Sequence, residues 1–183
     1  MNPASTEAST AALASTRTSA GPTVAELSRQ SPVLLVFLRH SGCTFCREAL
    51  ADLAAQRKAR EKVGTQLVLV HMTDDASFQT FAASYGLGDT PLVADADRRF
   101  YRALGLGEAS LWQLLDPRVW WRGFQAAILQ RHGFGGVQGN VAQMPGVFLV
   151  RDGRVVAGHI HRSPADRPNY LELCQLPRPA VSQ

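Results

Sequence analysis

The stretch from Pro32 to Leu53 constrains the fold of this chain more than any other. It contains an unbroken apolar run, Val33–Leu38. Such a run is typical of a strand covered on both faces, as in a sheet that lies between two layers of helices. A short polar loop follows, then two cysteines, then a segment with leucines at helical spacing. The stretch therefore predicts a central buried strand, a loop, and a helix that begins at the cysteines.

Cys43 and Cys46 enclose Thr44 and Phe45 at the start of this predicted helix. A helix N-terminus carries unpaired N–H groups and a partial positive charge, which favours a thiolate over a thiol. Because the cysteines lie about one turn apart, their sulfur atoms can form a disulfide with little backbone movement. The pattern favours a redox pair in which one thiol attacks and the other resolves. Two buried structural cysteines, or half of a zinc site, are the alternatives.

Position in the helix favours Cys43 as the attacking thiol, because Cys46 lies further in and is more easily covered. Arg39 and His40 directly precede the pair. We expect them to add positive potential to the site, and the alternative is that both are solvated loop residues.

Signals for helices and strands alternate along most of the chain. Thr23 and Glu26 form a capping-box pattern that predicts a helix before the first strand. Gln66–Met72 and Pro91–Asp95 predict further strands, separated by helical patterns, and so a mainly parallel sheet with right-handed crossovers. Asp152-Gly153 between two apolar runs is a strong hairpin signal, so the sheet is expected to end in an antiparallel pair.

An aromatic segment precedes this hairpin. Apolar residues recur at helical spacing over 111–132, on either side of Pro117, and all three tryptophans lie there. We expect two amphipathic helices inserted before the hairpin. They could cover a sheet face, form a lid over the cysteines, or make a dimer contact.

Composition limits the class of protein. A length of 183 residues and an apolar fraction of 45% suit one domain with a sizeable core, expected over 23–176 between a flexible tail (1–22) and a C-terminal tail (177–183). No apolar run is long enough to span a membrane, and the N-terminus lacks the basic start of a signal peptide, so we expect a cytoplasmic protein without a membrane partner. The net charge of +4 is spread along the chain, which argues against a nucleic-acid partner.

Three further side chains are candidates for a functional site. Cys174 is expected to be a small core residue of the last helix. His159 and His161 alternate on a predicted strand and so share a face, as metal ligands can. Without a second C-x-x-C, we predict no metal site.

Two pairs of segments resemble known families. VFLRHSGCTFC with MPGVFLVRDGRVV is similar to the thioredoxin-fold superfamily, in which a C-x-x-C faces a cis-proline at the start of the terminal hairpin. FLRHSGCTFCREALADL with PLVADADRRFYRALGL resembles the peroxiredoxin-like 2 group, related to selenoprotein L, of the alkyl hydroperoxide reductase/thiol-specific antioxidant superfamily. The resemblance implies a thioredoxin-like α/β fold: a central mixed sheet flanked by helices, with a helical insertion before the final β-hairpin.

The resemblance also implies roles for site residues. In the thioredoxin register Cys43 attacks, Cys46 resolves, Pro145 is the cis-proline, and the backbone of Met144 pairs with a substrate. In the peroxiredoxin register Cys46 takes the place of the peroxide-attacking cysteine and Cys43 that of a threonine. Peroxiredoxins also place an arginine near the position of Pro145, and this chain has none there.

We therefore expect a thiol–disulfide oxidoreductase that needs no cofactor. Its partners would be a disulfide-containing protein or a hydroperoxide, and a thiol reductant such as a thioredoxin or glutathione. A thiol peroxidase using Cys46 or Cys43 is the alternative. A redox-responsive binding protein without turnover, docking through 111–124, is a second alternative, and a homodimer is compatible with each.

Overall fold

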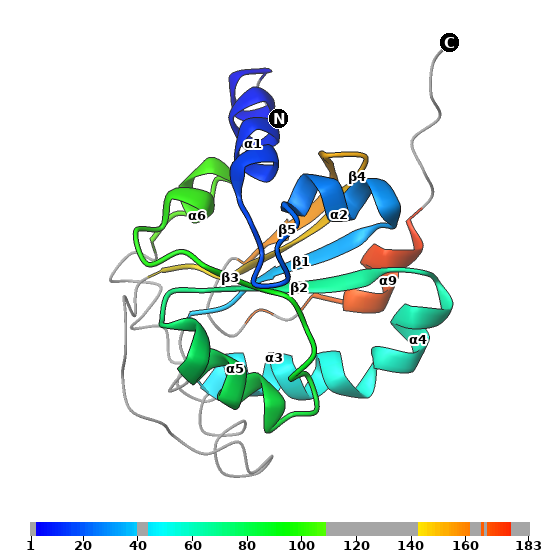
Figure 1. Ribbon diagram of the computed structural model, residues 1–183. Coiled ribbons are helices and arrows are strands. Elements are labelled where there is room, and N and C mark those ends of the chain that lie inside the picture. The colour runs from blue at the N-terminus through cyan, green and yellow to red at the C-terminus, as the bar shows by residue number, and fades with distance from the viewer. Residues whose placement is uncertain (1–2, 40–43, 109–142, 162–165, 167, 177–183) are drawn as a thin grey trace.

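The computed structural model describes residues 3–39, 44–108, 143–161, 166 and 168–176 (Figure 1). His40, Cys43 and the helices expected over 111–132 lie outside the described residues. None of the helices in the described ranges is both long and apolar enough to cross a membrane.

Five strands form one mixed sheet in the order β3-β2-β1-β4-β5. The first three pair in parallel, and β4 lies antiparallel to both β1 and β5. Every residue of β1 is buried, which confirms the predicted central strand. The strands are β1 (Val33–Phe37), β2 (Gln66–His71), β3 (Leu92–Ala94), β4 (Gly146–Arg151) and β5 (Arg154–Ile160).

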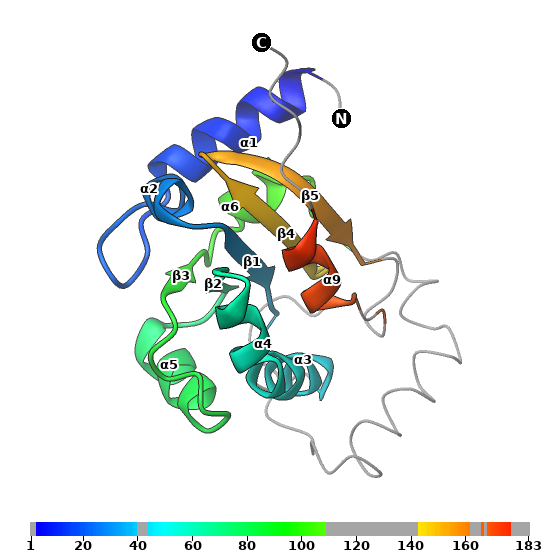
Figure 2. The same cartoon turned by 90° about the vertical axis from the view of Figure 1, so that its right-hand side faces the viewer.

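Helices cover both faces of this sheet, as Figures 1 and 2 show. Because side chains alternate along a strand, Leu35 and Phe37 of β1 join the core beneath α1, α2 and α6, and Leu34 and Val36 join the core beneath α3, α5 and α9. The described helices are α1 (Pro3–Ser15), α2 (Val24–Gln30), α3 (Thr44–Ala55), α4 (Arg57–Lys62), α5 (Asp75–Ala83), α6 (Arg99–Ala103) and α9 (Tyr170–Gln175). This is the predicted α/β architecture.

Two local signals in the sequence are confirmed. The Thr23 side chain and the Glu26 carboxylate form both bonds of a capping box at the start of α2. At the hairpin, Asp152 and Gly153 have φ values of 50° and 74°, the left-handed backbone of a two-residue turn that matches the twist of the strands.

The flexible tail expected at the N-terminus is wrong for the residues that form α1. Leu13 is fully buried in the core with α2 and α6, and the Ser19 backbone N–H donates to Leu92 O of the edge strand β3 (2.7 Å). The Ala/Ser/Thr composition of this segment gives no periodic apolar pattern, so the sequence did not indicate the tertiary contacts that bury Leu13 and Ser9.

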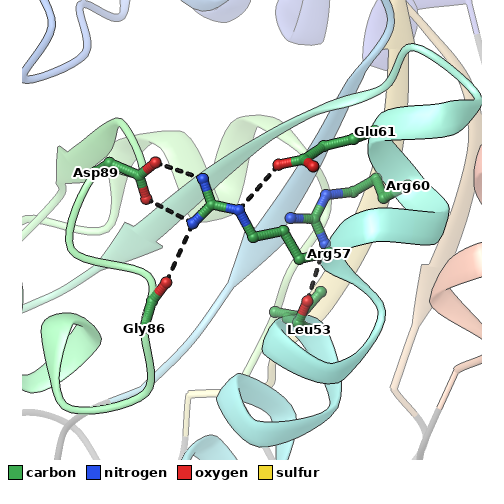
Figure 3. Close-up of polar contacts among 6 residues, drawn as sticks. All are labelled: Leu53, Arg57, Arg60, Glu61, Gly86 and Asp89. Carbon is green, nitrogen blue, oxygen red and sulfur yellow. Dashed lines mark hydrogen bonds and ion pairs between the residues drawn. The ribbon is translucent and has the colours of Figure 1, made fainter.

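Polar contacts hold α3 and α4 against the loop after α5 (Figure 3). Arg57 at the start of α4 donates to Asp89 Oδ1 (2.9 Å), Gly86 O (3.1 Å) and Glu61 Oε1 (2.8 Å). Its guanidinium holds the pKa of Asp89 below the ordinary value. Arg60 is buried and donates to Leu53 O in the last part of α3 (3.0 Å). These bonds fix the far end of the helix whose first turn carries Cys46.

Candidate active site

Cys46 lies in the first turn of α3, beside the carboxyl end of β1. It is the third residue of a 12-residue helix and is only 3% exposed. Its thiol is free. The unpaired N–H groups at the start of a helix favour the negative form of a sulfur in this position.

A backbone hydrogen bond also reaches this sulfur. The N–H of Arg39, just past the end of β1, donates to Cys46 Sγ at 3.2 Å. A donor to sulfur stabilises the thiolate more than the thiol, because the thiolate is the stronger acceptor. The loop between the strand and the helix therefore provides a second source of thiolate stabilisation.

Tyr101 of α6 contacts the peptide group that joins Leu38 and Arg39, on its carbonyl side. Its hydroxyl is fully buried and donates to the carbonyl of Leu38, and it also lies 3.3 Å from Val70 O. The Leu38 carbonyl and the Arg39 N–H belong to one peptide group, so hydrogen bonds run from the tyrosine through this group to the sulfur. Such chains strengthen each bond cooperatively. Burial, with the nearby charges of Cys46 and Asp95, raises the pKa of Tyr101, which keeps the hydroxyl protonated as a donor.

A small pocket, partly open to solvent, lies over Cys46. Its described lining combines apolar side chains with several charged or titratable ones. They are Val36, Phe37, Leu38, Arg39, Phe45, Cys46, Glu48, Ala49, Pro145, Val147, His161, Asp166 and Tyr170. A small molecule in this pocket would meet the sulfur and polar groups from β1, α3 and the hairpin together.

His161 enters this pocket just after β5. It is 9% exposed, and neither ring nitrogen has a hydrogen-bond partner. Burial lowers its pKa to about 4, with the Asp166 carboxylate acting in the opposite direction, so the ring is neutral at pH 7. The neighbouring His159 bonds instead to Asp166 (2.9 Å). The two histidine rings lie 5.4 Å apart, which confirms that they share a face.

The structure brings together several of the residues that the sequence singled out. Arg39, Phe45, Cys46 and Pro145 all line the pocket. Arg39 is 8% exposed, so the alternative of a solvated loop residue is wrong for it. Thr44 is buried at the first position of α3 and is absent from the described lining.

The structure of the segment before the hairpin differs from what was expected for Met144 and Pro145. None of the peptide bonds in the described chain is cis, so Met144–Pro145 is trans and the predicted cis-proline is wrong. Trans is the intrinsically favoured form, and here the backbone on each side is paired within the chain. The Met144 N–H donates to Gly107 O (3.0 Å), the Met144 carbonyl accepts from the Gln143 side chain (3.3 Å), and the Pro145 carbonyl accepts from the His161 N–H (3.3 Å). Met144 is thus already paired at both backbone groups, rather than waiting for a substrate.

The sequence connected His161 with the cysteines only as a possible metal ligand, and it did not connect Asp166, Glu48, Tyr101 or Tyr170 with them. One signal was available for His161. The hairpin pairs Gly146 with Ile160, so the residues just beyond that pair, Pro145 and His161, must lie together. Within the described residues, no group of three or more His, Cys, Asp or Glu side chains is arranged to hold a metal ion.

Comparison with known proteins places this site in a family. The family model described as AhpC/TSA antioxidant enzyme matches residues 50–163, more than half of the chain. The match begins after both cysteines, so their roles are not fixed by it. No curated protein matches the chain.

Solved peroxiredoxin structures share the fold at low sequence identity. A mutant of peroxiredoxin Q from Xanthomonas campestris is 18% identical, with a TM-score of 0.55 over 79% of this chain and 78% of that one. A mutant of peroxiredoxin 6 from Arenicola marina is 13% identical, with a TM-score of 0.59 over 87% and 66%. Reduced Prx3 from Vibrio vulnificus, in complex with hydrogen peroxide, is 17% identical, with a TM-score of 0.53 over 77% and 76%. The chain therefore belongs to the AhpC/TSA antioxidant enzyme family, thioredoxin-like proteins that act as thiol-dependent peroxidases or oxidoreductases.

Proposed function

We propose that this chain is a thiol peroxidase in which Cys46 attacks a hydroperoxide and Cys43 resolves the product. The observation that carries the proposal is a thiol, 3% exposed, that lines a small pocket partly open to solvent and accepts a backbone N–H bond. A hydroperoxide can enter such a pocket. A disulfide held in a folded protein cannot, because its sulfur must approach the attacking sulfur in line. The peroxide bound in the Vibrio vulnificus protein supports the same class of substrate.

The chemistry balances with groups named here. The Cys46 thiolate attacks one peroxide oxygen, the S–O bond forms, the O–O bond breaks, and the leaving oxygen takes a proton from water to give an alcohol or water. The sulfur is then a sulfenic acid. Cys43 attacks it as a thiolate, forms the Cys43–Cys46 disulfide and releases water. A thiol reductant returns the pair to the dithiol by exchange, and a thioredoxin or glutathione in the cytoplasm would serve.

Catalytic consumption of hydrogen peroxide by the full chain, with dithiothreitol as reductant, tests this proposal. We expect Cys46→Ser to abolish turnover. In a separate reaction without dithiothreitol, which would itself reduce a sulfenic acid, the reduced Cys43→Ser protein should react once and stop at a sulfenic acid on Cys46. Cys174→Ser is the matched control, since it removes an equally buried thiol outside the described lining of the pocket, and its rate should stay within about twofold of the unmodified protein.

The thiol–disulfide oxidoreductase predicted from the sequence is the second candidate. The burial of Cys46 also suits a resolving thiol behind an exposed, attacking Cys43. In that case Cys46→Ser would trap disulfide substrates on Cys43 and peroxide consumption would be negligible. Tight complex formation without turnover on either substrate would instead favour the redox-responsive binding protein. None of these tests depends on whether the chain forms a homodimer.

A further inference from the structure

His161 is the one described pocket side chain whose polar atoms are all buried without a partner. Both Nδ1 and Nε2 are inaccessible to solvent, and neither makes a hydrogen bond. Buried polar groups in native proteins are nearly always paired, and a bound ligand or water commonly completes those that look orphaned. An unpaired imidazole in the wall of the Cys46 pocket thus indicates a ligand with hydrogen-bonding atoms.

The charges around the pocket restrict that ligand. The described lining carries two acidic side chains, Glu48 and Asp166, against one arginine, Arg39. This balance disfavours an anion and suits a neutral molecule. Because burial lowers the pKa of His161 to about 4, the ring is neutral and offers one N–H donor and one bare nitrogen.

The attack on a peroxide needs a hydrogen-bond donor at one specific atom. Negative charge moves from the sulfur to the oxygen that leaves, and a donor fixed at that oxygen lowers the barrier. The Arg39 backbone N–H already donates to the sulfur, and Glu48 and Asp166 are acidic. Within the described lining, the Arg39 guanidinium is the competing donor, and the test below compares it with His161. His161 lies directly beside Pro145, since its backbone N–H donates to the Pro145 carbonyl (3.3 Å).

We propose that His161 is a catalytic residue whose ring N–H donates a hydrogen bond to the leaving oxygen of a neutral hydroperoxide at Cys46. This inference rests on the peroxidase function proposed above. The Cys46 thiolate forms the S–O bond as the O–O bond breaks, the sulfur is oxidised and the peroxide reduced. The leaving oxygen, stabilised by the imidazole N–H, takes its proton from water.

Single-turnover oxidation of Cys46 by hydrogen peroxide, mapped by dimedone labelling and mass spectrometry in the full chain, tests the assignment. We expect His161→Leu to slow oxidation by about 10- to 100-fold. His161→Gln keeps an N–H donor and should recover most of the rate. His159→Gln is the matched control on the same strand, because His159 bonds to Asp166 and is absent from the described lining, and we expect a change of less than about twofold.

Alkylation of Cys46 by iodoacetamide separates this role from others. Iodoacetamide reports the thiolate but needs no donor to a peroxide oxygen, so its rate should stay within about twofold in both His161 variants. Equal decreases in the rates of alkylation and of peroxide oxidation would overturn the proposal. They would mean that His161 stabilises the Cys46 thiolate or the folded structure instead. An unchanged rate of peroxide oxidation in His161→Leu would overturn it too. If the oxidation rate fell only in Arg39→Met, the Arg39 guanidinium would be the donor, and the proposal would again be overturned. If Cys46 of the unmodified protein is not oxidised at all, the peroxidase function itself fails.

Discussion

Cys46 and Cys174 occupy the same side of the sheet and are equally buried, yet their surroundings differ. Both are 3% exposed, and both belong to the core beneath α3 and α5. Cys46 lies in the first turn of a 12-residue helix, accepts the Arg39 N–H and lines a pocket. Cys174 lies in the six-residue α9, and burial raises the pKa of its thiol even though Arg60 and Arg151 are near.

This contrast shows that burial alone does not determine the reactivity of a thiol. What matters is where the sulfur sits along its helix, which N–H groups reach it, and whether a cavity gives access to it. Cys46 has all three advantages. Cys174 is a small core residue of the last helix, as the sequence predicted.

The largest expected effect is a direct difference between the two thiols. In the native protein we expect iodoacetamide to alkylate Cys46 at least about 1,000-fold faster than Cys174, which becomes accessible only when the structure opens locally. Peptide mapping by mass spectrometry gives both rates in one sample. In denaturant the two rates should converge, and a native ratio near one would remove the distinction.

The second-largest effect is expected in the pH dependence of stability, through His161 in the Cys46 pocket. The folded-state pKa of His161 is about 4, below the ordinary 6.5, so the unfolded chain binds a proton that the folded chain does not. Stability is therefore lost as the pH falls from about 6.5 towards 4, by up to about 3 kcal/mol for this group. Urea unfolding at a series of pH values measures the loss. His161→Leu should flatten the curve over this interval, and an identical curve in that variant would contradict the burial of a neutral ring.

A smaller effect is expected from changing Tyr101, whose hydroxyl donates to the Leu38 carbonyl beside the Cys46 site. Tyr101→Phe removes the donor to the Leu38 carbonyl and weakens the Arg39 N–H as a donor to sulfur. We expect a loss of about 1 kcal/mol in the free energy of unfolding and about threefold slower alkylation of Cys46. The rate at Cys174, compared after correction for stability, is the internal control. Equal slowing at both thiols would mean that the hydroxyl supports the fold without acting through this peptide group.

The smallest effect is expected at the ion pair remote from both sulfur atoms. Asp89→Asn weakens the paired contact with Arg57 (Figure 3), but both side chains are well exposed, so salt and water already screen it. We expect the melting temperature to change by no more than about 2 °C, with Cys46 alkylation unaltered. A clear change in Cys46 reactivity would show that the end of α3 controls its first turn.

The sequence predicts most of the fold because the relevant signals are local. The apolar run at Val33–Leu38, the capping box at Thr23 and the Asp152-Gly153 turn each specify their element from neighbouring residues. The N-terminal tail was mistaken because the contacts that order α1, including the burial of Leu13, are tertiary ones that its Ala/Ser/Thr composition does not indicate. The expected cis bond at Pro145 came from resemblance and not from local chemistry, and the hydrogen bonds of this chain hold a trans bond instead.

The site was predicted only where it is contiguous in sequence. Arg39, Phe45 and Cys46 were named because they surround the C-x-x-C motif. Tyr101 reaches the Leu38 carbonyl from α6 by packing, and His161 reaches the pocket from beyond β5 by strand register. Such contacts depend on the assembled sheet, so spacing along the chain does not reveal them.

Locating the first oxidised sulfur tests the central claim most directly. One equivalent of hydrogen peroxide is added to the reduced Cys43→Ser chain with dimedone present, and each cysteine is mapped by mass spectrometry. We predict a sulfenic acid on Cys46 and none on Cys174. In the matched Cys46→Ser chain we predict no comparable label on Cys43. Rapid labelling of Cys43 in that second chain, with Cys46 unreactive in the first, would contradict the account.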